Sequence, residues 1–220
     1  MVLAFACCCA SGATAAPSTK RVALVFDDGP VPEHCAGFLE LFAREGVHVT
    51  FSHEGRRVAA HPELARRVAE EGHEIANHSY THPHFKDLRA EAIAREILET
   101  QAAVQTATGH APRWLWAPFL EWNDAIAAAV APTNVRHFPI SQVQLVSSDD
   151  WNQTTDADDI VHRATTGIED RTIILFHEFR AETLARLPEI LAELRRQGCT
   201  FLTFSELAAT LTPEQLAVAR

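Results

Sequence analysis

Two kinds of segment alternate along the chain. Short continuous apolar runs are typical of buried strands, and longer segments have apolar residues at helical spacing. A strand is predicted over 21–26, followed by a helix that ends at Gly46 and a second strand over 47–51. The same order returns in a helix that ends at Gly72 before a strand over 74–77. It returns again in a leucine-rich helix before a strand over 200–202. Strand–helix alternation of this kind indicates a parallel sheet.

The remaining elements extend this alternation. Further helices are expected over 90–108, 123–131 and 156–168, and further strands near 115–117, 143–146 and 173–176. No sequence repeat is detectable. The pattern predicts an α/β protein and does not distinguish a closed barrel from an open sheet.

Residues with catalytic chemistry follow the predicted strands. Asp27 and Asp28 come directly after the first strand, and His78 follows the strand over 74–77. Asp150 and His177 follow two later strands. In closed parallel sheets, catalytic groups collect at the carboxyl ends of the strands, so we expect these side chains to share one edge.

Asp27 and Asp28 together with two histidines predict a metal site. Adjacent carboxylates repel each other unless a cation or a proton-transfer role compensates. Asp-Gly-Pro is also ordinary turn chemistry, and with twelve histidines in the chain a close pair such as His78 and His82 is a weak signal by itself. One Asp and two His would form a three-ligand set with an open position for water, which is typical of catalytic sites.

Four segments resemble a known family. Val25–Pro30 and His78–Pro83 are similar to the first two motifs of the polysaccharide deacetylases, the NodB homology domain of carbohydrate esterase family 4. Ser148–Trp151 resembles the fourth motif and Ile173–Glu178 the fifth, so the resemblance covers roughly residues 21–211. It implies a distorted (β/α) barrel with about seven parallel strands.

The third and fourth motifs depart from the family. The family usually has Arg-x-Pro-Tyr/Phe-Gly, whereas this chain has Trp116 at the arginine and Leu120 at the glycine. The arginine braces the catalytic carboxylate in the family, and Arg113 is a candidate to replace it. The leading Asp of the fourth motif is Ser147. These departures bear on substrate choice more than on metal binding.

The resemblance also implies roles for individual residues. Asp28, His78 and His82 would bind the metal, with zinc as the default ion and cobalt or a similar ion as an alternative. Asp27 would be the general base.

The remaining roles concern proton donation and the substrate. His177 is the candidate general acid, and Asp150 would hold its imidazole in the useful tautomer. The Phe119 amide is a candidate oxyanion donor. Substrate contacts are expected from Phe119, Trp116 and Trp151.

The leading functional prediction is a metal-dependent deacetylase of an N-acetylated glycan such as peptidoglycan or chitin, or of O-acetylated xylan. The alternatives are a hydrolase of a small cyclic amide or ureide and a catalytically weak carbohydrate-binding protein. The presence of both carboxylates, both histidines and His177 argues against a pure binding protein, because binding alone does not require them.

Composition narrows the classes of partner. The chain has 220 residues, of which 47% are hydrophobic, so it can bury a substantial core. Its net charge of −10 argues against a nucleic-acid partner and against attraction to anionic membranes. No segment after the leader has the length and apolar character of a membrane span.

The termini and cysteines complete the domain assignment. Residues 1–16 lack charge and end in small residues before Pro17, which is typical of a signal peptide and favours a periplasmic or extracellular enzyme; a disordered leader is the alternative. The deacetylase domain is predicted over 20–212 and a tail over 213–220. Cys35 and Cys199 are expected to be buried thiols.

Overall fold

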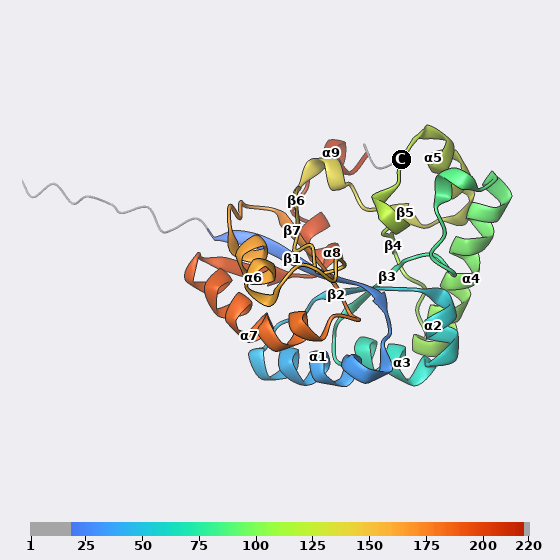
Figure 1. The fold of residues 1–220 in the computed structure, drawn as a ribbon. Coiled ribbons are helices and arrows are strands. Elements are labelled where there is room, and N and C mark those ends of the chain that lie inside the picture. The colour runs from blue at the N-terminus through green and yellow to red at the C-terminus, as the bar shows by residue number, and fades with distance from the viewer. Residues whose placement is uncertain (1–18, 218–220) are drawn as a thin grey trace, which may run out of the picture.

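The structure, a computed structural model, describes residues 19–217, so the predicted leader lies outside the described residues. All paired strands in it are parallel, and seven of them follow the order β5-β4-β3-β2-β1-β7-β6 (Figure 1). The eighth strand, β8, pairs with the start of β1. The strands are β1 Lys20–Gly29, β2 Thr50–His53, β3 Glu74–Asn77, β4 Trp114–Leu115, β5 Arg136–His137, β6 Gln144–Ser147, β7 Thr172–His177 and β8 Cys199–Leu202. Within residues 19–217 no pairing joins β5 to β6. The predicted distorted parallel barrel of about seven strands is confirmed, and it is open between these two edges.

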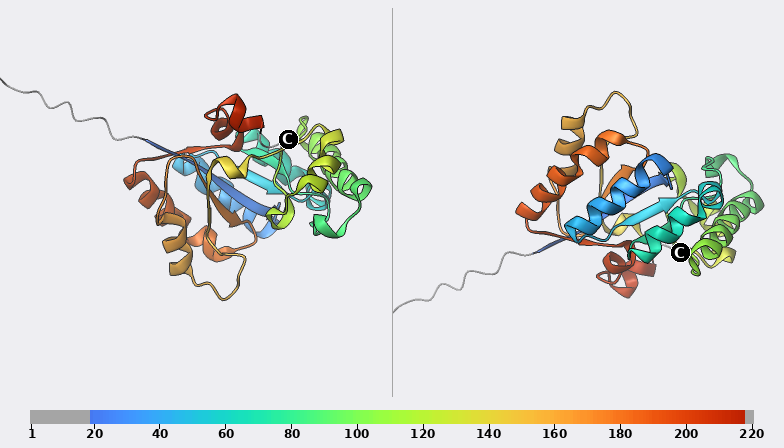
Figure 2. Two further views of the ribbon diagram at one scale, coloured as in Figure 1. Left: turned by 90° about the horizontal axis from the view of Figure 1, so that it is seen from above. Right: turned by 90° about the horizontal axis from the view of Figure 1, so that it is seen from below.

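Helices pack on both faces of this sheet. They are α1 Pro32–Glu45, α2 Gly55–Ala60, α3 Pro62–Glu70, α4 Ala90–Thr108, α5 Asp124–Val130, α6 Ala157–Thr165, α7 Ala181–Arg196, α8 Phe204–Ala208 and α9 Pro213–Ala217. Helices α7, α1 and α3 lie side by side along one face of the sheet, as Figures 1 and 2 show. Among the described residues, no helix has the length and apolar character needed to cross a membrane.

Most predicted elements form close to their expected bounds. The helix over 90–108 and the strand over 74–77 form as predicted. The strand expected over 47–51 starts later, at Thr50, because the Val49 N–H is donated to the Nδ1 atom of His73 and not to a neighbouring strand. The helix expected to reach residue 168 ends at Thr165.

Helix α2 and the C-terminal helix were missed by the sequence analysis. Helix α2 has six residues, too few to show an apolar period. It begins at Gly55, where an added Cβ would lie 2.5 Å from the Thr100 hydroxyl. Residues 213–217, expected to be part of a tail, form α9, and Leu216 packs on the core. Cys35 and Cys199 are free, buried thiols, as predicted.

A cluster of phenylalanines fixes the middle of β1. The ring of Phe26 lies 5.0 Å from Phe38 and 5.2 Å from Phe176 between centroids, and Phe42 and Phe51 complete the cluster. Alternate residues of a strand point to opposite faces. Phe26 therefore packs against the helices outside the sheet, and Asp27 points to the inside of the barrel.

A buried histidine should make stability depend on pH. The His137 ring is stacked on Trp122 at 3.8 Å between centroids, and burial lowers the pKa of His137 to about 4. An unfolded histidine has a pKa of about 6.5, so the unfolded chain binds this proton more tightly and the free energy of unfolding decreases as pH falls from 6.5 to 4.

We predict that His137→Phe retains an aromatic ring against Trp122 and reduces this loss. The free energy of unfolding should fall between pH 7 and pH 4 by about 1–3 kcal/mol less in the variant than in the wild type. Urea denaturation at the two pH values measures the difference. Equal losses in both proteins would contradict the prediction.

Candidate active site

The end of β1 directs two successive carboxylates into one cavity. The pairing of β1 with β2 shifts register between Asp27 and Gly29, and Asp28 has a left-handed backbone with φ 66°. This bulge re-aims the Asp28 side chain, which a regular strand would direct to the opposite face. Asp27 and Asp28 both line a cavity of about 420 Å³. The strand thus continues through the two aspartates to Gly29, past the end expected from the sequence.

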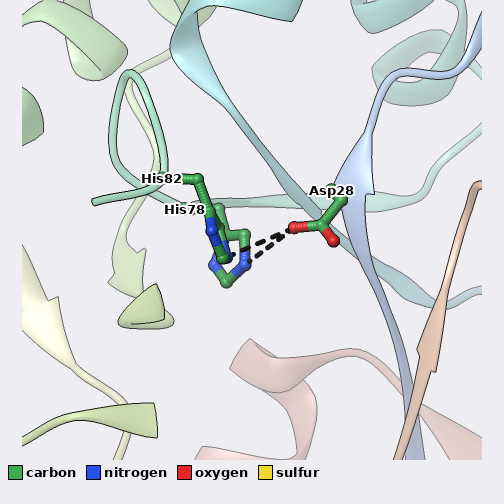
Figure 3. A group of neighbouring side chains, drawn as sticks. All are labelled: Asp28, His78 and His82. Carbon is green, nitrogen blue, oxygen red and sulfur yellow. Dashed lines mark ion pairs between the residues drawn. The ribbon is translucent and has the colours of Figure 1, made fainter. Parts of the chain in front are cut away.

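Asp28, His78 and His82 form a compact group in this cavity (Figure 3). The Oδ1 atom of Asp28 lies 3.4 Å from the Nε2 atom of His78 and 3.4 Å from that of His82. Two ligands of a tetrahedral ion at 2.0–2.2 Å are about 3.4 Å apart, so these separations fit one divalent ion. Asp28 Oδ1 is buried and has no hydrogen-bond partner within residues 19–217, as expected of a ligand atom.

The backbone of residue 116 fixes the orientation of the His78 ring. The Nδ1 atom of His78 lies 2.6 Å from the carbonyl oxygen of Trp116. A carbonyl only accepts hydrogen bonds, so Nδ1 carries the proton and Nε2 is free to face Asp28. The ligand arrangement therefore depends on where the chain runs after β4.

Asp27 and Asp28 have opposite pKa shifts. Burial raises the pKa of Asp27 to about 6, against the opposing charge of His78. Burial also acts on Asp28, but the charges of the nearby imidazoles, first among them His78, outweigh it and lower the pKa of Asp28. Burial alone would lower the pKa of His78, yet the charges of Asp27 and Asp28 raise it to about 9. A divalent ion at this position would displace that proton.

His177 lies opposite Asp27 on the neighbouring strand. The two residues are register partners in the β1–β7 pair. The Nδ1 atom of His177 lies 2.7 Å from the Oδ1 atom of Asp150. Asp150 is fully buried, and its Oδ2 accepts hydrogen bonds from the His177 backbone N–H and from the Thr183 hydroxyl. The predicted contact between Asp150 and His177 is thus present.

This environment favours the imidazolium form of His177. Burial lowers the pKa of His177, but the hydrogen bond to Asp150 and the charge of Asp27 outweigh it, so the pKa is raised. A protonated imidazole on one side of the cavity and a carboxylate on the other can donate and accept a proton at the same bound molecule.

Aromatic side chains form the mouth of the cavity. The exposed fraction is 51% for Phe119 and 58% for Trp151. The Phe119 ring stacks on His84 at 3.7 Å between centroids. The complete lining is Asp27, Asp28, His78, His82, Phe119, Leu120, Ser147, Trp151, Leu175 and His177. Of the three expected substrate contacts, Phe119 and Trp151 line the cavity.

The structure places Trp116, an expected substrate contact, in a different environment. Its side chain is fully buried and packs against Phe204, and it does not line the cavity. The indole N–H is donated to the Oδ2 atom of Asp27 at 2.9 Å. Arg113 is exposed and lies over the ring of Trp114, with which it makes a cation–π contact at 5.2 Å. Trp116 itself contacts Asp27 at the position where the family has its arginine.

Some lining or supporting residues, among them Leu120, Leu175 and Thr183, were not assigned a role from the sequence. Leu120 lines the cavity and has φ 55°, a conformation that glycine adopts without strain. Leu120 also lines an adjoining cavity of about 220 Å³ together with Trp122 and His137. Leu175 lines the first cavity from β7, and Thr183 holds Asp150 from α7. In the sequence, the replacement of the third-motif glycine by Leu120 could have indicated that this residue has a role in the site.

Sequence comparisons relate this chain to known proteins. Residues 14–138 match the family model described as Polysaccharide deacetylase. The chain is 33% identical over 192 residues to the peptidoglycan-N-acetylglucosamine deacetylase of Listeria monocytogenes, covering 87% of this chain and 40% of that relative. It is 33% identical over 199 residues to the chitooligosaccharide deacetylase of Rhizobium leguminosarum bv. trifolii, covering 81% of this chain and 87% of that relative.

A solved structure is also similar to this chain. The family 4 carbohydrate esterase from Streptomyces lividans in complex with acetate matches with a TM-score of 0.76 and 31% identity, over 84% of this chain and 93% of that one. The present chain spans less than half of the Listeria relative. The solved structure shares the fold of this chain. The activity of the longer Listeria protein as a whole is stated of that protein only.

The ligand geometry predicts that His78→Ala impairs zinc binding. Removal of one of three ligands should lower zinc affinity by more than the roughly 10- to 100-fold loss that outer-shell substitutions cause. His84→Ala is the matched control, because His84 is an exposed histidine that pairs with Glu121. Mass spectrometry of bound zinc after dialysis measures the difference. Full zinc content in His78→Ala would contradict the assignment.

Proposed function

Since this chain belongs to the polysaccharide deacetylase family, we propose that it is a metal-dependent hydrolase that removes acetyl groups from an N-acetylated glycan. The observation that carries the proposal is the Asp28, His78 and His82 group, which lies in the same cavity as Asp27 and His177. Amide hydrolysis needs a Lewis acid, a base and an acid at one point, and these residues can meet all three needs.

Asp28, His78 and His82 would hold the divalent ion. When bound, the ion would polarise the acetyl carbonyl and favour ionisation of a water. Zinc is our proposed ion, because two imidazoles and a carboxylate suit it, and cobalt or a similar ion is the alternative.

Asp27 and His177 would move the protons. Asp27 has one oxygen held by Trp116, and its Oδ1 is without a hydrogen-bond partner in residues 19–217, so Oδ1 is the atom that would accept the proton of the attacking water. His177, held by Asp150 with a raised pKa, would donate a proton to the departing nitrogen. The amide C–N bond then breaks, and acetate and a free amine leave.

The mouth of the cavity suits a sugar ring. Phe119 and Trp151 are exposed aromatic side chains, and flat rings can pack on the apolar faces of pyranoses. The relatives are named for peptidoglycan and chitooligosaccharides, which makes N-acetylated glycans our first choice. O-Acetylated xylan is the second substrate. The small-amide enzyme and the weak binding protein are the alternatives that the assay below separates.

The first test is acetate release from N-acetylated chitooligosaccharides, peptidoglycan and acetylated xylan. We expect the zinc-loaded wild-type protein to release acetate from an N-acetylated glycan. Asp27→Asn and a chelated wild-type sample should both lose this release, because the first removes the base and the second the metal. Asp149→Asn is the matched control and should retain acetate release, because Asp149 is an aspartate that does not line the cavity. Absence of release from all three glycans by protein that still binds zinc would refute the proposed function.

We further predict that His177→Ala lowers kcat by about 10²- to 10⁴-fold, as loss of a general acid does. Zinc content should stay at the wild-type level, because His177 is not part of the ligand group. His162→Ala, an exposed histidine on α6, should retain activity. The assigned role would be wrong if His177→Ala lost zinc together with activity.

A further inference from the structure

The third motif of this chain departs from the family at a residue that contacts the candidate base. The family usually has arginine at position 116, where this chain has tryptophan. The Trp116 indole N–H is donated to Asp27 Oδ2 at 2.9 Å, with both residues buried. Indole nitrogen is a donor only and seeks an acceptor when it is buried. Asp27 is therefore its sole acceptor among the hydrogen bonds of the described residues.

This bond restricts the rotation of the Asp27 carboxylate. With Oδ2 held by the indole, the second oxygen, Oδ1, has no hydrogen-bond partner in residues 19–217, while Asp27 lines the catalytic cavity. Without a donor at Oδ2, the two oxygens could exchange places or rotate toward His78, whose Nε2 lies 3.7 Å from Oδ2. The bond thus selects one orientation for the group that must accept a proton.

A neutral donor also has an electrostatic consequence. An arginine at this position would bring a positive charge beside Asp27 and close to the Asp28, His78 and His82 group. Like charges at short range in a buried site repel strongly. The indole supplies a hydrogen bond and no charge, so it orients Asp27 without opposing a cation in the ligand group.

Packing and backbone contacts hold Trp116 in place. Its ring packs against Phe204 at 5.1 Å between centroids, inside a core cluster that includes Phe138. The carbonyl of the same residue accepts the hydrogen bond from His78 Nδ1. One residue therefore orients two members of the site, His78 through its backbone and Asp27 through its side chain.

We propose that Trp116 is a positioning residue that holds the Asp27 carboxylate in its reactive orientation, in place of the arginine of the family. Its side chain does not line the cavity, and it acts through Asp27. The inference rests on the proposed deacetylase function. It also explains how the chain can keep the reaction without the motif arginine.

The test compares Trp116→Phe with Trp114→Phe. Both remove an indole N–H from a buried ring, but Trp114 donates to the Ser205 hydroxyl at 3.0 Å, away from the cavity. Loss of packing volume is thus matched. We expect Trp116→Phe to lower kcat by about 10- to 100-fold, with KM and zinc content nearly unchanged, because a misoriented base slows the chemical step. Trp114→Phe should retain the wild-type kcat.

A second measurement, by NMR, detects the hydrogen bond between Trp116 and Asp27 directly and does not depend on enzyme activity. In protein labelled with ¹⁵N-tryptophan, the indole signal absent from Trp116→Phe belongs to Trp116. We expect Asp27→Ala to shift this indole proton upfield and to leave the Trp114 signal in place. Equal kcat in the two tryptophan variants, or an unchanged Trp116 signal in Asp27→Ala, would overturn the inference. An inactive wild-type protein would instead refute the proposed function, while the indole signal still reports the contact.

Discussion

Asp27 and Asp28 face one cavity because β1 loses its regular alternation just before Gly29. A regular strand would bury one of these carboxylates among the phenylalanines that surround Phe26. Phe26, two residues before Asp28, packs against Phe176 of β7 and against phenylalanines of α1, and these contacts fix the strand just before the bulge. The meeting of Asp28 with His78 and His82, in the cavity that Asp27 also lines, depends on this local break in the strand.

The break also gives two identical side chains different environments. Asp27 is directed inward, where burial favours its neutral form and an indole N–H holds one oxygen. Asp28 turns toward His78 and His82, whose positive charge favours its ionised form. One carboxylate is suited to accept a proton and the other to stay charged beside a cation. The division of roles follows from position along the strand, because the residue type is the same.

Local sequence was sufficient for the parts of the site that lie at strand ends. The parallel alternation predicted Asp27, His78 and His177 at one edge, and the family motifs indicated Asp28, His78 and His82, which the structure brings together. The contact between Trp116 and Asp27 was not predictable in this way, because it joins residues 89 positions apart in the chain and leaves no period or spacing. The sequence does not show whether an aromatic side chain is exposed or buried, so both Trp151 and Trp116 were expected to contact substrate. In the structure Trp151 is exposed, whereas Trp116 is buried against Phe204.

Leu120 belongs to the linings of two cavities. It lines both the site cavity and the adjoining cavity that contains Trp122 and His137. The main chain at Leu120 already has a left-handed conformation, φ 55°, that glycine adopts at no steric cost. Removal of the Leu120 side chain would therefore add space to both cavities without requiring the main chain to change its conformation at this residue.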